Sequence, residues 1–176
     1  MMPMDMFERL CDVAEAQAGY FTTSQAEAAG VDRPRLSRFA AAGRVQRVRR
    51  WIHRPQHFPR SRHEDLFMVW LETSPDSVIS HESALLLYEL SDVLPVEIHA
   101  TVPRTASHRR RHGLRLHTNR ICEKDTTYYE GLPVTTVARA IADVALAGLS
   151  DEFVEQATHD EAATRRVGAG CAPIVR

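Results

Sequence analysis

Apolar residues in the first part of the chain recur three and four positions apart, which is the spacing of one helical face. Residues 6–18 follow this pattern and predict a first amphipathic helix. The apolar side chains on this face are Phe7, Leu10, Val13 and Ala14. A short second helix is expected over residues 24–29, because Thr22 or Thr23 can cap it and Gly30 can end it in a left-handed conformation.

A third helix is expected immediately after Gly30 and the apolar Val31. Asp32 is a suitable N-cap, and Pro34 is tolerated in a first turn, where its missing N–H costs no hydrogen bond. The expected buried face consists of Leu36, Phe39 and Ala40, and the opposite face carries Arg33, Arg35, Ser37 and Arg38. Gly43 ends the helix, so the first three helices form a helix-turn-helix unit.

The segment that follows the third helix has the alternation of a small β-hairpin. Its apolar positions, Val45, Val48 and Ile52, alternate loosely with Gln46, Arg47, Arg49 and Arg50. A two-stranded hairpin after a helix-turn-helix is a wing, so the sequence predicts a winged helix-turn-helix. Two prolines and the loss of apolar periodicity over residues 54–63 place a domain boundary after residue 62.

Beyond that boundary the pattern predicts a mixture of helices and strands. Helices are expected from the apolar run 66–71 and over 82–90, with Ser80 as the N-cap of the latter. Residues 96–102 and 114–117 alternate apolar and polar side chains, as in strands with one buried face; the apolar positions are Val96, Ile98, Ala100, Val102, Leu114 and Leu116.

The C-terminal part predicts a hairpin that turns at Glu130 and Gly131, followed by a helix from Thr135 or Thr136 to about Ala147. Within that helix Arg139 and Asp143 are spaced to form an ion pair. A last helix is expected over 151–166 and a loose tail over 167–176. The predicted fold class is α+β, with a winged helix-turn-helix at 1–62, a small mixed α/β C-terminal domain at 63–166, and the tail.

The charge is distributed very unevenly along the chain. Between Arg33 and Arg62 there are ten arginines and no acidic residue, although the formal net charge of the whole chain is -1. A local cationic field of this kind attracts a polyanion, and arginine also pairs with guanine edges in the major groove of DNA. The expected DNA-binding residues are Arg33, Arg35, Ser37, Arg38, Arg44, Arg47, Arg49, Arg50 and Arg54. The alternative interpretation is that these arginines form a solvated surface that binds no nucleic acid. Residues 121–162, by contrast, hold nine acids and two bases.

Composition narrows the class of protein further. The longest uncharged apolar run, residues 66–71, is too short to cross a bilayer, and the N-terminus is not that of a signal peptide, so a cytoplasmic location is expected. Cys11, Cys122 and Cys171 are far apart, which indicates neither a disulfide framework nor a CxxC zinc site.

The sequence shows no motif of catalysis or cofactor binding, such as a glycine-rich phosphate loop, a GxSxG turn or a nuclease-type acidic cluster. His81 and Glu82 are ordinary residues of a first helical turn. His99 and His117 could meet across a sheet and could hold a metal with a carboxylate, but no motif locates that carboxylate. We therefore expect a structural histidine pair, with no catalytic residue, metal or cofactor. The basic loop 108–112 is expected either to contact DNA or a partner, or to be solvated.

The chain resembles the AbiEi-type antitoxins of type IV toxin-antitoxin systems, the abortive-infection group. Residues 19–50 carry the likeness to the family's winged helix, and ISHESALLLYELSDVLP, VEIHATVPR, LRLHTNR and GLPVTTVARAIADVA carry it further. The resemblance implies an N-terminal domain that binds inverted repeats in its own promoter, and a C-terminal domain that opposes a nucleotidyltransferase toxin. The family's wing usually reads like RRGVYR, whereas this chain has Trp51 at the glycine position.

These observations leave three hypotheses about function. The first is a DNA-binding autorepressor and antitoxin that acts without enzymatic activity, with promoter DNA and a nucleotidyltransferase toxin as partners and two protomers on a two-fold operator. The second is a metal-dependent nuclease that its winged helix delivers to DNA. The third is a stand-alone transcriptional regulator without a toxin.

Overall fold

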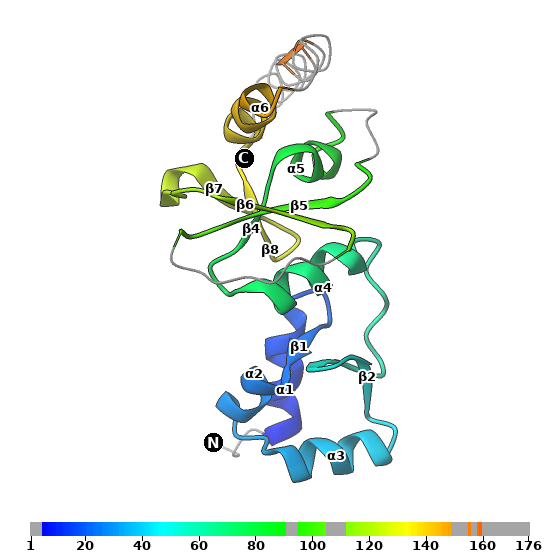
Figure 1. The fold of residues 1–176 in the computed structure, drawn as a ribbon. Helices are drawn as coiled ribbons and strands as arrows, with labels where there is room; N and C mark the ends of the chain where they lie inside the picture. Colours follow the sequence, from blue (N-terminus) through cyan, green and yellow to red (C-terminus); the bar gives the residue numbers. More distant parts are fainter. Residues whose placement is uncertain (1–4, 91–94, 105–111, 149–154, 156–157, 160–176) are drawn as a thin grey trace, which may run out of the picture. The chain divides into compact units, whose positions relative to one another are not determined.

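The computed structural model describes residues 5–90, 95–104, 112–148, 155 and 158–159 (Figure 1). Its chain divides into two compact units. The first comprises Met1–Pro75 with Glu130–Leu132, and the second comprises Asp76–Tyr129 with Pro133–Arg176. We treat the two units separately.

The first unit combines four helices with a three-stranded sheet among its described residues. The elements in chain order are α1 (Met6–Glu15), β1 (Phe21–Thr22), α2 (Thr23–Ala28), α3 (Arg33–Ala41), β2 (Val45–Arg49), β3 (Ile52–Pro55) and α4 (Glu64–Thr73). The strand order is β1-β3-β2, and both pairings are antiparallel. The predicted two-stranded wing is therefore present, and the short strand β1, which the sequence pattern did not predict, extends it to three strands.

Local capping signals explain where α2 and α3 begin and end. Thr22 accepts a hydrogen bond from the Gln25 backbone N–H while the Gln25 side chain accepts from the Thr22 N–H, which completes the predicted capping box. Gly30 has φ +89° and ends α2 as expected. Asp32 then caps α3 through a 2.9 Å hydrogen bond from the Arg35 N–H.

The core of this unit is formed by the apolar faces of the three predicted helices and the wing. Its buried side chains are Leu10, Ala14, Phe21, Ala26, Val31, Leu36 and Val45, with Met6, Phe7, Val13, Phe39 and Phe58 packed against them. One expectation about this face was wrong. Ala40 is exposed, whereas Leu36, one turn earlier, is buried in the core.

Replacing Asp32 by alanine should lower the free energy of unfolding of this unit by about 1 kcal/mol, since an α3 N–H would lose its capping acceptor. Urea unfolding followed by tryptophan fluorescence measures this effect, because both tryptophans, Trp51 and Trp70, belong to this unit. The matched control is Asp12→Ala, which removes an exposed carboxylate from the middle of α1. Equal losses in the two variants would contradict the capping role.

Helix α4 belongs to the first unit, which thus extends past the boundary at residue 62 that the sequence predicted. The reason is visible in its burial, since Leu66, Phe67, Met68 and Val69 are all buried. The Phe67 ring lies 6.1 Å from that of the fully buried Tyr20. Prolines at 55 and 59 therefore mark a connection within a unit.

The second unit contains a five-stranded sheet with strand order β6-β5-β4-β8-β7. Its elements are β4 (Val78–Ile79), α5 (His81–Leu87), β5 (Ile98–Val102), β6 (Leu114–Thr118), a 3-10 turn η1 (Glu123–Asp125), β7 (Thr126–Tyr129), β8 (Leu132–Thr135) and α6 (Val137–Leu146). β4 pairs antiparallel with β5 and parallel with β8, whereas β5 and β6 are parallel. Helices α5 and α6 pack against each other and lie on one side of this sheet (Figure 1).

Strand β5 differs from the strand expected from its alternating pattern. Val96 is 98% exposed and precedes the strand, whereas His99 and Thr101, which were expected on an open polar face, are buried. The cause is α5, which packs against β5 and covers the face that carries these polar side chains. The short central strand β4 was not predicted.

The helix after the hairpin follows the prediction closely. Thr136 is the N-cap of α6, and Arg139 Nε donates to Asp143 Oδ1 at 2.9 Å. The Arg139 guanidinium also reaches Asp125 Oδ2 at 3.0 Å, and Asp143 is only 6% exposed. The expected surface pair is thus a partly buried three-residue cluster.

The α+β fold class, with a winged helix-turn-helix before a mixed α/β part, is confirmed. The expected last helix and tail fall largely or wholly outside the described residues, as does most of the basic loop at 108–112. No helix among the residues with described positions combines the length and apolarity needed to cross a bilayer.

Candidate nucleic-acid interface

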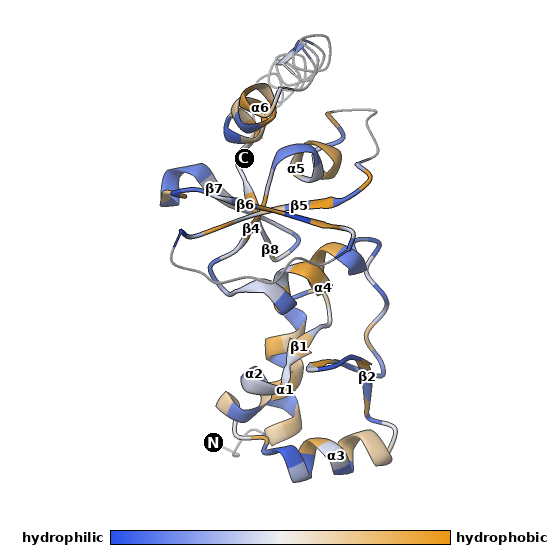
Figure 2. Ribbon diagram, in the orientation of Figure 1, coloured by the Kyte–Doolittle hydropathy of each residue, from blue (hydrophilic) through white to orange (hydrophobic). Residues whose placement is uncertain are grey.

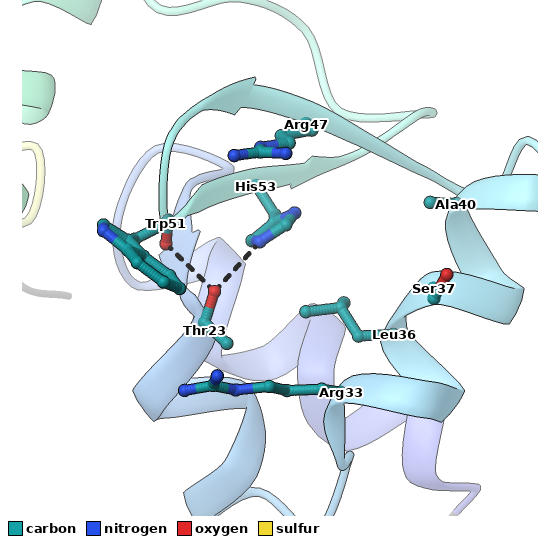
Figure 3. A pocket seen from close by; sticks show the side chains of 8 residues that line it. All are labelled: Thr23, Arg33, Leu36, Ser37, Ala40, Arg47, Trp51 and His53. Carbon is teal, nitrogen blue, oxygen red and sulfur yellow. Dashed lines mark hydrogen bonds between the residues drawn. The ribbon is translucent and has the colours of Figure 1, made fainter.

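The first unit has a hollow of about 360 Å³ between α3 and the wing. Its lining residues are Thr23, Arg33, Leu36, Ser37, Ala40, Arg47, Trp51 and His53 (Figure 3). Four of these come from α3, three come from the wing strands and their turn, and Thr23 comes from the start of α2. Both elements carry hydrophilic and hydrophobic residues (Figure 2), and Arg33, Ser37 and Arg47 in the lining are exposed.

The wing turns through Arg50 and Trp51, and the backbone of Trp51 has φ +118°. A bulge between Arg47 and Arg49 accompanies this turn. The conformation is costly for a residue with a side chain, and it is held by the Trp51 carbonyl, which accepts from the Thr23 N–H at 2.9 Å. The Thr23 hydroxyl in turn contacts His53 Nε2 at 3.1 Å (Figure 3). The start of α2 therefore fixes the tip of the wing.

Trp51 is half-exposed at this tip and lies among cationic side chains. The guanidinium carbons of Arg50 and Arg33 lie 5.0 and 5.6 Å from its ring centroid. Such contacts hold the arginine side chains near the ring without using their N–H groups, one of which in Arg33 donates to Glu27. From the sequence, Trp51 was identified only as a residue at a position where the family usually has glycine. The contacts of its ring with two arginines were not predicted.

Five of the nine predicted DNA-binding residues line the outer side of α3 and the wing with exposed side chains. These are Arg33, Ser37, Arg38, Arg47 and Arg50. Among the described residues, Arg33 is the one of these five that pairs with an acid, Glu27 at 2.9 Å, and it is still 66% exposed. An exposed pair of this kind is worth about 0–1 kcal/mol, so a phosphate can replace the carboxylate.

Three other predicted residues point away from that surface. Arg35 is half-buried and directs its guanidinium to the Met6 sulfur and the Gly30 carbonyl. Arg44 stacks on Phe7, 3.7 Å from its ring centroid. Arg49 lies 3.6 Å from Glu72 and 3.7 Å from Asp65, two acids of α4. Helical periodicity explains Arg35, because residues 33, 37 and 40 share one side of α3 and residue 35 lies on another.

Arg54 requires a correction. The sequence placed it among the phosphate contacts, but it is 8% exposed and donates to the Gln46 side chain at 3.0 Å across the β2–β3 pair. Residues alternate between the two faces of a strand, and Arg54 falls on the covered face of β3, so it stabilises the wing from within.

Burial, reinforced by the positive charge of Arg47, lowers the pKa of His53 below its usual value. The unfolded chain therefore binds a proton more readily than the folded one, and stability due to neutral His53 is present above about pH 6.5 and is lost as the pH falls below it. The urea midpoint from tryptophan fluorescence should be lower at pH 5.5 than at pH 7.5. His53→Gln should reduce that difference, whereas His57→Gln, a change at an exposed histidine, should not. An unaltered difference in His53→Gln would contradict this assignment.

The geometry defines a winged helix-turn-helix in which α3 and the wing present cationic side chains to solvent. Residues 8–50 match the family model of the transcriptional regulators described as AbiEi antitoxins. This match confirms the resemblance over the N-terminal winged helix, which supports a regulator or antitoxin role. The comparison with curated proteins found no match.

Proposed function

We propose that the protein is a DNA-binding autorepressor and the antitoxin of a type IV toxin-antitoxin pair. The observation that supports DNA binding is the exposed arginine set on α3 and the wing, which surrounds an open hollow and lies within the segment that matches the antitoxin regulators. A regulator of this kind binds the chromosome and would act in the cytoplasm, and it needs no catalytic residue of its own.

In this proposal α3 enters the major groove, as the second helix of a helix-turn-helix does. Arg33, Ser37 and Arg38 then reach base edges, and Arg47 and Arg50 bind phosphates beside the groove. The proposal no longer includes Arg54 as a DNA contact, and it assigns Arg35, Arg44 and Arg49 to supporting the reading surface. Two protomers would occupy an inverted repeat, one on each half-site.

The partner proposed for the remainder of the chain is a nucleotidyltransferase toxin encoded beside it. Two features support this partner: the resemblance to AbiEi-type antitoxins, and the excess of acids over bases in residues 121–162. An acidic surface is suited to a cationic partner, because complementary potentials increase the association rate and suppress wrong partners.

A reporter assay tests autorepression directly. The protein's own upstream region drives the reporter, and the full chain is supplied from a second plasmid. We expect repression by the wild-type chain and none after three base-pair changes in each half of the inverted repeat. Expression that does not respond to the chain would overturn the proposal.

Two further assays separate the proposal from its alternatives. Plasmid DNA incubated with the purified chain and Mg²⁺ or Mn²⁺ should stay intact, whereas a nuclease would cut it. Co-expression with the neighbouring gene should relieve any growth arrest that this gene causes alone. A stand-alone regulator would repress its promoter but relieve no toxicity.

A further inference from the structure

Three histidines that are far apart in the sequence meet in the second unit. His81 begins α5, His99 lies in β5 and His117 lies in β6, and one ring nitrogen of each falls within 4.8 Å of the others. The sequence suggested that His99 and His117 could meet across a sheet, and the parallel β5–β6 pairing brings them together. The carboxylate that no motif could locate is that of Glu82, next to His81.

The separation of two of the rings is that of ligands around one small cation, whereas the Glu82 contact has the length of a short hydrogen bond and would have to lengthen for both atoms to bind an ion. His117 Nε2 lies 3.2 Å from His99 Nδ1, and Glu82 Oε2 lies 2.5 Å from the same Nδ1. Zinc binds imidazole nitrogen at about 2.0–2.1 Å, and two such ligands of a tetrahedral ion are therefore about 3.3 Å apart. His99 Nδ1 carries at most one proton and cannot satisfy both neighbours, and Glu82 Oε2 is buried without a hydrogen bond of acceptable geometry.

Neighbouring hydroxyl groups orient the histidines from behind. His81 Nδ1 contacts Ser80 Oγ at 2.9 Å, and that oxygen accepts from the Thr101 hydroxyl at 2.7 Å. This arrangement leaves Nε2 of His81 for a ligand, which is the pattern by which metal-binding histidines are usually fixed. The His81 ring is stacked on His117 with centroids 3.6 Å apart, so it would have to rotate to point at the same ion as the other two.

Burial and neighbouring groups shift the pKa values of three members of this cluster. Burial and the charges of His81 and His99 lower the pKa of His117 to about 4, so its imidazole is neutral at pH 7. Burial also lowers the pKa of His81. Although burial opposes ionisation of Glu82, its contact with His99 holds the pKa of this carboxyl below the usual value.

We propose that His81, His99, His117 and Glu82 bind one divalent transition-metal ion, with Zn²⁺ as the ion that fits best. A set of mostly imidazole ligands favours zinc and its neighbours in the periodic table over Mg²⁺ or Ca²⁺, which require oxygen ligands. The ion would tie the start of α5 to strands β5 and β6, and would therefore stabilise the second unit. This site is independent of the DNA surface on α3 and the wing.

Cobalt provides a direct spectroscopic test on the untagged full chain after its metals have been removed by a chelator. Addition of Co²⁺ should produce the visible absorption of a tetrahedral complex that saturates at one equivalent. Zn²⁺ should abolish this absorption and raise the thermal midpoint of the second unit, while Mg²⁺ should do neither. A wild-type chain that gives no absorption and no thermal shift would overturn the proposal.

Variants then assign the ligands. His117→Gln should weaken Zn²⁺ binding about 100-fold or more in a competition titration, because even the outer-shell partners of metal sites change affinity about 10–100-fold. Ser80→Ala, which removes such a partner, should weaken it about 10-fold. The matched control is His112→Gln, at an exposed histidine of the same unit. Wild-type affinity in His117→Gln would refute the assignment.

A ligand variant that fails to fold would be recognised by far-UV circular dichroism in the absence of metal. Glu82→Gln is the second variant for this reason, since it preserves the size of the side chain and removes only the charge. Loss of Zn²⁺ affinity in folded Glu82→Gln supports the site. Unchanged affinity in folded Glu82→Gln excludes the carboxylate as a ligand and contradicts the proposal as stated.

Discussion

Alanine at both Arg38 and Arg47 should weaken binding of the full chain to its operator by about 100-fold at physiological salt. A base contact is worth about 1–3 kcal/mol and a phosphate contact adds to it, so the pair supplies this factor. Both side chains are exposed on the surface formed by α3 and the wing. Fluorescence anisotropy with a labelled duplex of the protein's own upstream region measures the loss.

The matched control for this experiment removes the same charge elsewhere in the unit. Arg9 on α1 and Arg60 after the wing are both exposed and lie outside the lining of the hollow. The double variant Arg9→Ala, Arg60→Ala should keep most of the affinity for the operator. The double variant Arg38→Ala, Arg47→Ala should lose affinity and should also reduce the slope of log K against log salt by about 2. Equal weakening in both double variants would mean that net charge alone, and not the α3–wing surface, binds DNA.

Replacing Arg139 by alanine should destabilise the second unit by about 3 kcal/mol. Arg139 is the partner of both Asp143, which is 6% exposed, and Asp125. Breaking a buried pair leaves its remaining charge uncompensated, and that penalty typically reaches about 3–5 kcal/mol. Urea unfolding followed by far-UV circular dichroism gives the loss, and hydrogen exchange in α6 locates it in this unit.

Two companion variants test the cause of that loss. Arg115→Ala removes an exposed arginine from β6 and should change stability by less than about 0.5 kcal/mol. Arg139→Lys keeps the charge but cannot reach two carboxylates with a planar fork, so its loss should lie between the other two. A loss in Arg139→Ala no larger than that in Arg115→Ala would show that Asp143 is not destabilised by losing this partner.

Features that depend on a few adjacent residues were predicted well from the sequence. The capping box of Thr22 and Gln25, the Asp32 cap and the glycine that ends α2 all occur as expected. So does the α6 ion pair. Each of these interactions is made within one turn of the backbone, so its geometry follows from sequence spacing alone.

Features that depend on which face of an element is covered were predicted less well. Arg54 and Arg47 both look like surface arginines of the wing in the sequence, yet only Arg54 is buried. His99 was expected to be partly exposed, and α5 covers it. The contact between Glu82 and His99 could not be found by spacing, because it joins a helix to a strand across a fold whose strand order was unknown.

Trp51 is a different case, because its backbone conformation opposes local preference. A positive φ at a bulky residue is costly and persists only where surrounding contacts fix it. Here those contacts are the hydrogen bonds from Thr23, which lies 28 positions earlier in the chain. Sequence reasoning identified the missing glycine but had no means of finding the compensating contact.

The salt dependence of binding to the upstream duplex, compared with a scrambled duplex of equal length, tests the central proposal most directly. We predict a dissociation constant of about 10⁻⁸ M or tighter for the upstream duplex at physiological salt, at least about 1,000-fold weaker binding to the scrambled duplex, and steep weakening of both as salt rises. Equal affinities for the two duplexes, or binding that is insensitive to salt, would contradict the proposal that α3 and the wing read DNA.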